Sequence, residues 1–455
     1  MKLTVIGGGG VRAIQLARSL AQAAPKLGIR RIVFMDSDPE KLAIFGRMSR
    51  EAARRLAPEL DFQITTDAEQ AVRDADYIIT TIRAGGDDMR VRDERAALDL
   101  GLLGQETTGA AGFSFAMRSV PALAAYCALA KRLAKPDVKV FNFTNPAGVV
   151  SQTLRDMGYD FTFGICDTPG SLLASVAKLK GVSPDRVTGS CYGLNHLSFF
   201  DSVKLDGREL LPGLLADERL YAQTDMGFFQ RDLAQHMGCL LNEYLYYFFY
   251  REQAVAHILA AQQTRGELIA GLNRGMIAEL SGMDVEREFD ACLKVYEKWY
   301  GRREGAYMAN ETGKRRDRGA WRFDLWAEDD GGYAGVALKY IRARVTGERL
   351  SMTLCVPNGG AIPGLADSDV VEVTCDLENG AFTPRRVEKP GELQMELIRR
   401  VKLYERYASE ALRTKSVSKA VDCLMVHPLV NSWSLAKKLA EIYIEANRAF
   451  SGGWH

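Results

Sequence analysis

The 455-residue sequence lacks an excess of charge of either sign. It has 59 lysine and arginine residues against 58 aspartate and glutamate residues, which gives a formal net charge of +1. Without a basic excess or a long basic run, the sequence does not favour a nucleic acid or a membrane surface as a partner. We therefore expect the partners to be small molecules and further copies of the same chain.

Long apolar runs are also scarce. No stretch approaches the roughly 20 apolar residues that are needed to cross a bilayer. Residues 1–6 lead directly into a glycine cluster, which is unlike a cleavable signal peptide. These two observations predict a cytoplasmic protein without a membrane-spanning helix.

Paired cysteines are missing as well. The eight cysteines are scattered, and none stands in a CxxC or another paired spacing. In a reducing compartment we expect most of them to be small apolar core residues, with one available for chemistry. The length of the chain predicts two or three domains.

The first motif that is present is a glycine cluster after a short β-rich run. Residues 3–6 lead into Gly7, Gly8, Gly9 and Gly10, and apolar residues then recur at helical spacing. This order predicts a strand, a glycine turn and a helix. Glycines let the backbone approach a pyrophosphate, and the N-terminus of a helix adds partial positive charge. The turn is therefore a candidate dinucleotide site.

An acid stands where a dinucleotide site needs one. The β-rich run of residues 31–35 ends in Asp36, the position at which such folds hold the ribose hydroxyls. A carboxylate there favours NAD over a cofactor with a 2′-phosphate. Arg12 replaces the third small residue of the usual GxGxxG pattern and offers a guanidinium to a phosphate. The alternative is a tight turn without a ligand.

Three further β-rich runs, at residues 76–82, 138–143 and 161–165, end in polar residues. Ligands of open α/β sheets bind at the carboxyl ends of the strands. Arg90, in an arginine-rich segment, is the first candidate for an anionic substrate, although a solvated helix start is the simpler interpretation. The expected floor of the site comprises Asn142, Asn145, Cys166 and Asp167.

Strand and helix patterns alternate up to residue 165, which predicts an α/β fold with a Rossmann-like doubly wound sheet in residues 1–165. Residues 166–455 predict a mixed α+β domain for substrate binding and oligomerisation. It has a β-like segment at 187–205 that closes in a hairpin turn. Helices are expected at 331–341, 393–413 and 417–447. The charged residues 279–318 are expected to face solvent.

Two residues of the second part are chemically distinctive. His196, one of five histidines, follows a β-like run as Cys166 does, and both are good ligands for a divalent metal. Spacing alone nevertheless favours a buried structural role for His196. Tyr244 lies in an aromatic stretch at residues 242–250, for which core or subunit-interface packing is the default.

Together these motifs resemble one family, the NAD-dependent glycosidases of glycoside hydrolase family 4. The similar segments run along most of the chain and include the glycine cluster, GQETTG at 104–109, NFTNPAG at 142–148, GICDTP at 164–169, GLNHL at 193–197, TRGE at 264–267, and residues 358–362 with 370–373. Their shared order makes the resemblance specific.

The resemblance implies a redox route to hydrolysis. Bound NAD⁺ would take hydride from sugar C3, which acidifies the hydrogen at C2. A base would remove that proton, the C1 substituent would leave, water would add, and NADH would return the hydride. A divalent metal, usually Mn²⁺, would bind the C2 and C3 oxygens as a Lewis acid.

The resemblance also assigns roles to residues. Cys166 and His196 match the metal ligands, and Asp167 matches the acid that assists the leaving group. Tyr244 matches the C2 base, which requires a lowered phenol pKa from the metal and Arg265. Substrate contacts match Arg90, Asn145, Asn195 and Arg265, with Arg265 and Arg12 as partners for a 6-phosphate. Cofactor contacts match Gly7, Gly9, Gly10, Arg12, Asp36 and Asn142.

Two departures concern the anomer of the substrate. Residues 10–13 resemble a subgroup usually assigned as 6-phospho-β-glucosidases, whereas the Cys-Asp-x-Pro sequence at 166–169 is closer to 6-phospho-α-glucosidases. Because the first steps occur at C3 and C2, the chemistry tolerates either anomer. We expect the β activity, with α as the alternative and an unphosphorylated glycoside third.

Two other classes fit the same fold. One is a lactate- or malate-type 2-hydroxy acid dehydrogenase, which would form NADH in stoichiometric amounts without a metal. The other is a non-catalytic NAD-binding sensor, which would have no need for the complete set of Cys166, Asp167, His196 and Tyr244. Family habit and the long amphipathic tail predict a homodimer or homotetramer.

Overall fold

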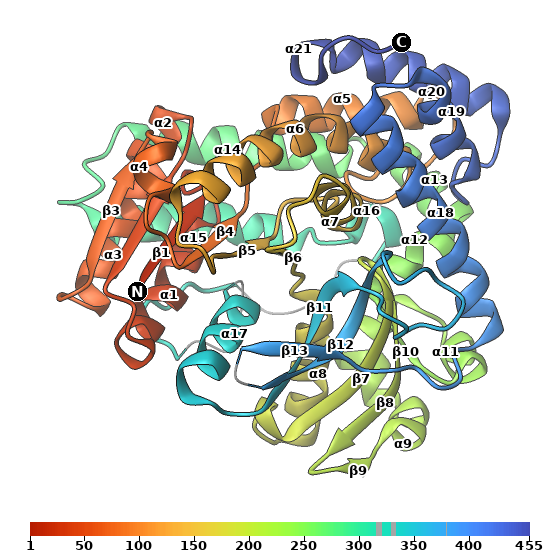
Figure 1. Cartoon of the computed structure of the whole chain (residues 1–455), viewed down its shortest axis with the longest axis horizontal. Helices are drawn as coiled ribbons and strands as arrows, with labels where there is room; N and C mark the ends of the chain where they lie inside the picture. The colour runs from red at the N-terminus through yellow and green to blue at the C-terminus, as the bar shows by residue number, and fades with distance from the viewer. Residues whose placement is uncertain (315–320, 329–333, 379) are drawn as a thin grey trace.

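The computed structural model describes residues 1–314, 321–328, 334–378 and 380–455 (Figure 1). The predicted helix start at residues 331–333 and part of the charged segment, residues 315–318, lie outside the described residues. The remainder of that predicted helix is present as α17 (Gly335–Thr346).

Six parallel strands confirm the doubly wound sheet of the first part. Their order across the sheet is β3 (Asp61–Thr65), β2 (Arg31–Met35), β1 (Lys2–Ile6), β4 (Tyr77–Thr80), β5 (Lys139–Asn142) and β6 (Thr162–Gly164). This is the 3-2-1-4-5-6 order of dinucleotide-binding folds. The strand β3 is missing from the sequence-based expectation, because it is a half-buried edge strand without a continuous apolar run.

The two faces of the sheet have separate cores. Leu3 and Val5 of β1 pack in one core with helix α1 (Ala13–Leu27). Ile6 belongs to a second core, which includes Ala71 and Val72 of helix α4 (Ala68–Val72). Successive side chains of a strand point to opposite faces, so helices on both sides bury the apolar residues of the strand.

Strands from the second part extend the same sheet. β11 (Leu350–Pro357) pairs antiparallel with β6 and is followed outward by β12 (Val370–Glu378) and β13 (Ala381–Pro384). A second sheet consists of β7 (Val187–Leu194), β8 (Leu197–Leu205), β9 (Arg208–Glu209) and β10 (Leu240–Leu241). The two parts are therefore interleaved, and a domain boundary at residue 165 remains a prediction.

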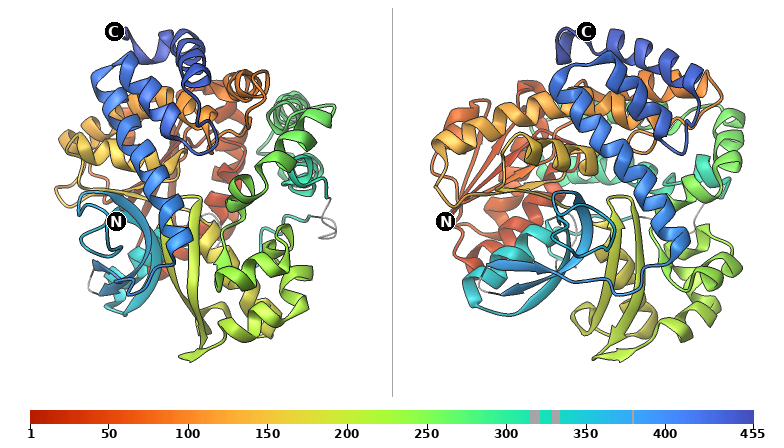
Figure 2. Two further views of the ribbon diagram at one scale, coloured as in Figure 1. Left: turned by 90° about the vertical axis from the view of Figure 1, so that its right-hand side faces the viewer. Right: turned by 45° about the vertical axis from the view of Figure 1, so that its right-hand side comes forward.

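The remaining helices surround these sheets (Figures 1 and 2). They are α2 (Pro39–Lys41), α3 (Arg47–Leu56), α5 (Gly86–Leu98), α6 (Ala110–Leu133), α7 (Ala147–Asp156), α8 (Thr168–Lys180), α9 (Leu211–Ala216), α10 (Glu218–Gln223), α11 (Arg231–Met237), α12 (Tyr246–Phe249), α13 (Arg251–Ala260), α14 (Arg265–Ser281), α15 (Phe289–Gly305), α16 (Ala309–Thr312), α18 (Glu392–Thr414), α19 (Val417–Val426), α20 (Trp433–Ala446) and α21 (Arg448–Ser451).

The single helix predicted for residues 417–447 is wrong. The structure has two helices, α19 and α20, with a break between Val426 and Trp433. Pro428 disfavours helical backbone at the residue before it, and His427 is accordingly extended, with φ −63° and ψ 125°. Ser432 then caps the next helix by accepting a hydrogen bond from the amide of Leu435.

Helix α6 corrects the expectation about apolar runs. It has 24 residues and is long and apolar enough to cross a membrane by length and composition, although 61% of its most apolar window is buried inside the protein. Its alanines and glycine give a weak apolar signal per residue, so the sequence shows no continuous apolar run there. The apolar surface of α6 serves internal packing.

A buried ion pair joins the C-terminal helices to the first part. Arg118 of α6 donates to Asp93 of α5 over 2.6 Å and to Asn447 over 2.7 Å. The hydroxyl of Tyr443 in α20 donates to the backbone oxygen of Asp93 over 3.1 Å. Both charged side chains are almost completely buried. Removal of either one leaves an uncompensated charge in the core.

We expect Asp93→Ala to lower the free energy of unfolding by about 3–5 kcal/mol, because Arg118 would remain buried without its partner. Urea unfolding followed by circular dichroism measures the change. Asp88→Ala is the matched control, since Asp88 lies on the same helix and pairs with Arg274 at an exposed position. The control should cost no more than about 1 kcal/mol. Equal losses in the two variants would contradict this interpretation.

Candidate active site

A cavity of about 510 Å³ lies at the carboxyl ends of the parallel strands. Its wall includes almost all of the predicted site residues: Gly7, Gly9, Gly10, Arg12, Asp36, Arg90, Asn145, Cys166, Asp167, Asn195, His196, Tyr244 and Arg265. Residues from both parts of the chain therefore meet in one site. The strand ends supply the floor, as the sequence predicts.

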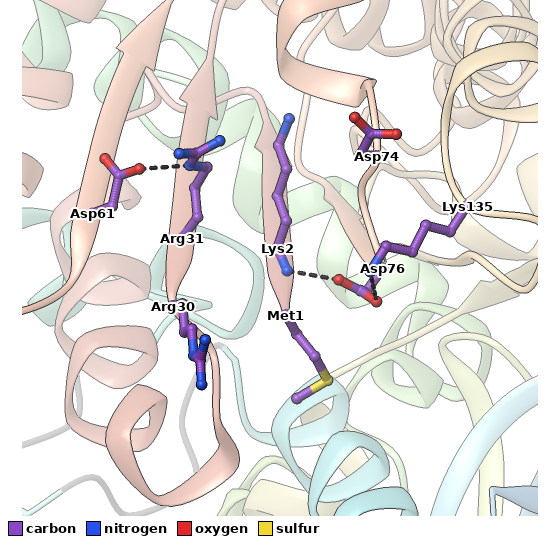
Figure 3. Close-up of a pocket in the computed structure, with 8 residues that line it drawn as sticks. All are labelled: Met1, Lys2, Arg30, Arg31, Asp61, Asp74, Asp76 and Lys135. Carbon is purple, nitrogen blue, oxygen red and sulfur yellow. Dashed lines mark hydrogen bonds and ion pairs between the residues drawn. The ribbon is translucent and has the colours of Figure 1, made fainter.

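A second hollow, of about 430 Å³, lies at the opposite edge of the sheet (Figure 3). It is lined by Met1, Lys2, Arg30, Arg31, Asp61, Asp74, Asp76 and Lys135. Its charges largely pair with one another: Arg31 contacts Asp61 over 2.5 Å, and Lys135 contacts Asp76 over 2.7 Å. Paired charges at the amino ends of the strands do not form a ligand site of this fold.

The glycine turn and the acid after β2 contact each other directly. The amide of Gly9 donates to Asp36 Oδ2 over 2.8 Å, and the amides of Gly7 and Gly8 both donate to the Met35 carbonyl. Gly7 has φ +103°, and a Cβ there would lie 2.5 Å from the Thr81 carbonyl oxygen. The predicted strand, glycine turn and helix are thus confirmed. Burial raises the pKa of Asp36.

Asn142 differs from its prediction as a wall residue. Its side chain is buried, accepts hydrogen bonds from the Thr80 hydroxyl over 2.8 Å and the Thr144 amide over 3.2 Å, and donates to the Thr144 carbonyl over 2.9 Å. All of these contacts lie inside the fold, and Asn142 is not part of the cavity wall. It therefore shapes the turn that presents Asn145.

Cys166 and Asp167 follow β6 directly. Cys166 is buried, and burial raises the pKa of its thiol well above the ordinary value, with Glu372 and Asp167 adding to the effect. Asp167 is half-buried at the start of α8. In α8, which is described throughout, the Asp167 side chain makes no capping hydrogen bond. The carboxylate is therefore directed to the cavity and not used to cap its own helix.

His196 lies in the tight turn between β7 and β8, with φ +62°. Its Nδ1 is 3.3 Å from the Thr107 hydroxyl oxygen. That hydroxyl donates to Gln105 Oε1 over 3.0 Å. The backbone amides of Thr107 and Thr108 donate to the same oxygen, so this atom of Gln105 is an acceptor. Since the Thr107 proton is committed, Nδ1 of His196 must be the donor. The lone pair of Nε2 is then free for a ligand.

The electrostatics keep His196 neutral. Burial lowers the pKa of His196 to about 4, although the negative charge of Glu106 opposes the shift. A neutral imidazole is the form that binds a metal ion. The His196 side chain is buried but lines the cavity, so its role as a metal ligand stays a prediction beside the structural role that spacing favours.

Tyr244 stacks on the imidazole of His196, with ring centroids 3.9 Å apart and an interplanar angle of 5°. In the chain alone, burial, together with Glu243 and Glu106, raises the pKa of the Tyr244 phenol. The low pKa that is expected with a bound metal stays a prediction. Arg265 lies above the ring of Tyr307 and donates one hydrogen bond to the Ala306 carbonyl. The hydrogen bond with Tyr307 opposes the raised pKa of Tyr244 but does not offset burial. A bound cation would oppose it further.

Arg90 is buried between two acids. Its Nε contacts Glu94 over 2.9 Å and Glu106 over 3.5 Å, and Glu106 also contacts Arg83 over 2.5 Å. Although burial opposes it, the attraction of Arg83 and Arg90 holds the pKa of Glu106 well below its usual range. The positive charge of Arg90 is therefore largely neutralised by protein groups. Arg90 is accordingly a weaker candidate for the main contact of an anionic substrate than the sequence predicts.

Arg303 is a site residue that the sequence analysis missed. The segment was expected to face solvent, but Arg303 lines the cavity. Burial and the repulsion of Arg12 and Arg265 lower the pKa of Arg303, and its Nε is buried without a hydrogen-bond partner among the described residues. A signal was present in the sequence, because Tyr296, Tyr300 and Arg303 recur at the spacing of one helix face.

Glu372 is the second missed residue. It stands in the apolar strand β12 and is 1% exposed, yet it reaches the back of the site. Its carboxylate accepts hydrogen bonds from Asn195 and Ser198 over 3.0 and 2.7 Å. Burial raises the pKa of Glu372 to about 7. A lone acid inside the run Val370 to Val373 is the signal that could have revealed it.

The donor set fits a divalent metal in part. Within the described residues, no group of three or more histidine, cysteine, aspartate or glutamate side chains is arranged to hold a metal ion. Cys166 and His196 supply a thiol and a neutral imidazole to the same cavity. Two protein donors of this kind suit a transition metal whose remaining positions are filled by substrate or water.

The fold and the site define an enzyme of the dinucleotide-binding class with a second reactive centre beside the nucleotide cleft. The chain belongs to glycosyl hydrolase family 4. The model of the family 4 glycosyl hydrolases matches residues 2–182, and the model of the family's C-terminal domain matches residues 191–430. This confirms the resemblance drawn from the motifs, and the protein is a glycoside hydrolase.

Curated relatives carry both anomeric names. The chain is 28% identical over 455 residues to the 6-phospho-beta-glucosidase BglT of Thermotoga maritima, covering 99% of each chain. It is 27% identical over 467 residues to the 6-phospho-alpha-glucosidase of Leptotrichia buccalis, covering 98% of each. The small difference in identity does not separate the two activities.

Solved structures agree with the fold. The 6-phospho-beta glucosidase from Thermotoga maritima with manganese, NAD⁺ and glucose-6-phosphate has a TM-score of 0.81, 26% identity and 99% coverage of both chains. A malate dehydrogenase from Salinibacter ruber has a TM-score of 0.50, 14% identity and 91% coverage of this chain. The latter shows a shared fold alone, so it does not support the dehydrogenase alternative.

We expect His196 to be the Nδ1–H tautomer in the metal-free protein at neutral pH. Long-range ¹H–¹⁵N correlation spectra distinguish the two ring nitrogens, and five histidines are few enough to assign by substitution. Thr107→Val, which removes the acceptor for Nδ1–H, should shift His196 toward the other tautomer. Thr108→Val is the control, since the Thr108 hydroxyl is buried and has no hydrogen-bond partner among the described residues. An Nε2–H tautomer in the unmodified protein would contradict the assignment.

Proposed function

We propose that the protein hydrolyses 6-phosphoglucosides with NAD and a divalent metal, Mn²⁺ in the first instance, as cofactors. The observation that carries the proposal is the group of three guanidinium side chains, Arg12, Arg265 and Arg303, at one cavity. The names of the relatives and the glucose-6-phosphate in the Thermotoga maritima structure support it. The β activity is favoured, and the α activity is the alternative.

The arginines favour a phosphorylated substrate. Like charges that are gathered in a partly buried place repel one another, and the lowered pKa of Arg303 reports this repulsion together with burial. A phosphate relieves it, because guanidinium groups match phosphate oxygens with paired hydrogen bonds. Arg12 stands at the glycine turn, whereas Arg265 begins α14 and Arg303 lies near the end of α15. We assign the sugar phosphate to the latter two.

The glycine turn and Asp36 support NAD as the dinucleotide. Gly7, Gly9 and Gly10 leave room for the pyrophosphate beside the N-terminus of α1. The Asp36 carboxylate is held by the amides of Gly9 and Asp38 at 2.8 and 3.0 Å. A fixed carboxylate at this place accepts hydrogen bonds from ribose hydroxyls and repels a 2′-phosphate.

The chain's own residues would hold the metal, orient the sugar and transfer protons. When bound, NAD supplies a hydride acceptor for sugar C3, and the metal supplies Lewis acidity at the C2 and C3 oxygens. Cys166 and His196 would hold the metal, and Asn145 and Asn195 would orient the sugar hydroxyls. Asp167 would give a proton to the leaving group from its position at the start of α8.

Tyr244 would take the proton from C2. Its raised pKa in the chain alone means that the phenol is protonated at neutral pH. The phenolate therefore requires a nearby positive charge, which the stacked position on His196 makes available when a metal is bound. The proposal therefore requires a bound metal for removal of the C2 proton.

The anomer rests on two local features. The sequence of residues 10–13 supports the β assignment, and Asp167 after Cys166 supports the α alternative. An acid that can protonate the leaving group serves a poor leaving group of either configuration.

A cytoplasmic location is also proposed, since the eight cysteines are free and buried, as in a reducing compartment. A homodimer or homotetramer completes the proposal.

We expect the reduced protein with NAD⁺ and Mn²⁺ to release p-nitrophenol from p-nitrophenyl β-glucoside 6-phosphate, measured by absorbance. Release from the α anomer instead would support the alternative activity. Chelation should abolish release and added Mn²⁺ should restore it. The unphosphorylated glucosides are matched controls and should react far more slowly. No release from either phosphorylated anomer would refute the proposed substrate, and full activity after chelation would refute the metal role.

We expect Arg303→Met to lower kcat/KM for the phosphorylated substrate by about 10–100-fold, since a hydrogen bond to a charged group contributes about 1.5–3 kcal/mol. The dissociation constant of NAD⁺ should stay within about twofold. Arg302→Met is the matched control, because Arg302 is exposed and lies over the ring of Trp299. The assignment fails if both variants behave alike, or if Arg303→Met weakens NAD⁺ binding as much as it weakens substrate use.

A further inference from the structure

Glu372 has a position that the proposed chemistry does not explain. It belongs to β12, far from the other site residues in sequence. The residue is 1% exposed and stands between valines. A buried acid is costly unless each oxygen is hydrogen-bonded. An apolar residue would fill the same place at a lower cost in free energy. The contacts of its two oxygens therefore need a reason.

One carboxylate oxygen holds the turn that carries His196. Asn195 Nδ2 donates to Glu372 Oε1 over 3.0 Å. Because the amide nitrogen of Asn195 is engaged behind the cavity wall, its Oδ1 is the end that remains for a ligand. Asn195 directly precedes His196, whose backbone is in the left-handed region with φ +62°. A fixed Asn195 thus limits the orientation of the next residue.

The other oxygen begins a chain of hydrogen bonds toward Tyr244. The Ser198 hydroxyl donates to Glu372 Oε2 over 2.7 Å, and Asn242 Nδ2 donates to that same hydroxyl oxygen over 3.2 Å. Asn242 Oδ1 in turn accepts from the backbone amide of Tyr244 over 3.0 Å and caps the helical turn that begins there. One carboxylate is therefore connected to two turns of the site.

We propose that Glu372 is the positioning residue that fixes His196 and Tyr244 relative to each other. It does so through Asn195 on one side and through Ser198 and Asn242 on the other. The stacked rings of His196 and Tyr244, 3.9 Å apart, are the arrangement that this link holds. The inference rests on the proposed function, in which these two residues serve the metal and the C2 proton.

A third contact of Glu372 provides the control. The Cys355 thiol approaches Glu372 Oε1 at 3.8 Å, a weak contact with a strand that carries no site residue. Cys355→Ala removes a neighbour of the carboxylate but leaves both links to the site turns. It should therefore keep kcat within about twofold.

The test uses Glu372→Gln, which keeps the size of the side chain but replaces one acceptor with a donor. We expect kcat and Mn²⁺ affinity each to fall by about 10–100-fold, the usual range for groups that orient metal ligands. Mn²⁺ affinity is measured by electron paramagnetic resonance of free Mn²⁺, and NAD⁺ affinity by fluorescence. NAD⁺ affinity should stay within about twofold, because the glycine turn is not part of the chain of hydrogen bonds.

Ser198→Ala interrupts only the link to Tyr244. It should lower kcat but leave Mn²⁺ affinity within about threefold. In the double variant with Glu372→Gln, the fall in kcat should be smaller than the product of the two single falls, because the two residues belong to one network. Multiplicative losses, or an equal fall in NAD⁺ affinity, would overturn the inference. If Glu372→Gln does not fold, an unchanged kcat in Ser198→Ala overturns it.

Failure of the proposed function is distinguishable from failure of this inference. If the unmodified protein releases no p-nitrophenol from either phosphorylated glucoside, the substrate assignment fails. The Mn²⁺ measurements on Glu372→Gln and Cys355→Ala still decide whether Glu372 positions the metal ligands. If the unmodified protein is active and Glu372→Gln binds Mn²⁺ and turns over as well, only the positioning role is wrong.

Discussion

Parallel alignment of β1, β4, β5 and β6 is the constraint on which the site depends. It brings the ends of four strands, distant in sequence, to one edge of the sheet. The glycine turn, the arginine segment, the Asn145 turn and Cys166 each follow one of these strands. Their meeting at one cavity therefore needs no long-range contact beyond the sheet itself. This is why the sequence predicts the floor of the site well.

The walls depend on a different kind of contact. β12 extends the first sheet and also packs on β7, where the Thr374 hydroxyl accepts from the Cys191 amide over 2.8 Å and donates to the Gly189 carbonyl over 3.1 Å. This contact between β12 and β7 places the turn that carries His196 next to the ends of the parallel strands. Helices α14 and α15 then bring Arg265 and Arg303 to the same cavity. Local patterns show at most which helix face Arg303 occupies, and they do not show which cavity that face lines.

The limits of sequence reasoning follow from this division. Strands and helices with strong apolar periodicity were predicted with their order, and so was the glycine turn with Asp36. The edge strand β3 and the inward side of α15 depend on partners elsewhere in the chain. The break at Pro428 has a local cause, the effect of the proline on the backbone of His427. Arg90 and Tyr244 show a further limit. Both line the cavity, but the ion pairs of Arg90 with Glu94 and Glu106 and the raised pKa of Tyr244 follow from the tertiary structure.

Burial sets the charge states of the site in one direction. It raises the pKa values of the Cys166 thiol and the Tyr244 phenol and lowers that of His196, so all three groups are neutral in the chain alone. In the proposed function Cys166 and Tyr244 would lose a proton to act as a ligand and a base, and a positive charge nearby would favour each loss. One bound cation would then serve both groups. The burial that keeps these three groups neutral would also make the reaction depend on the bound cation.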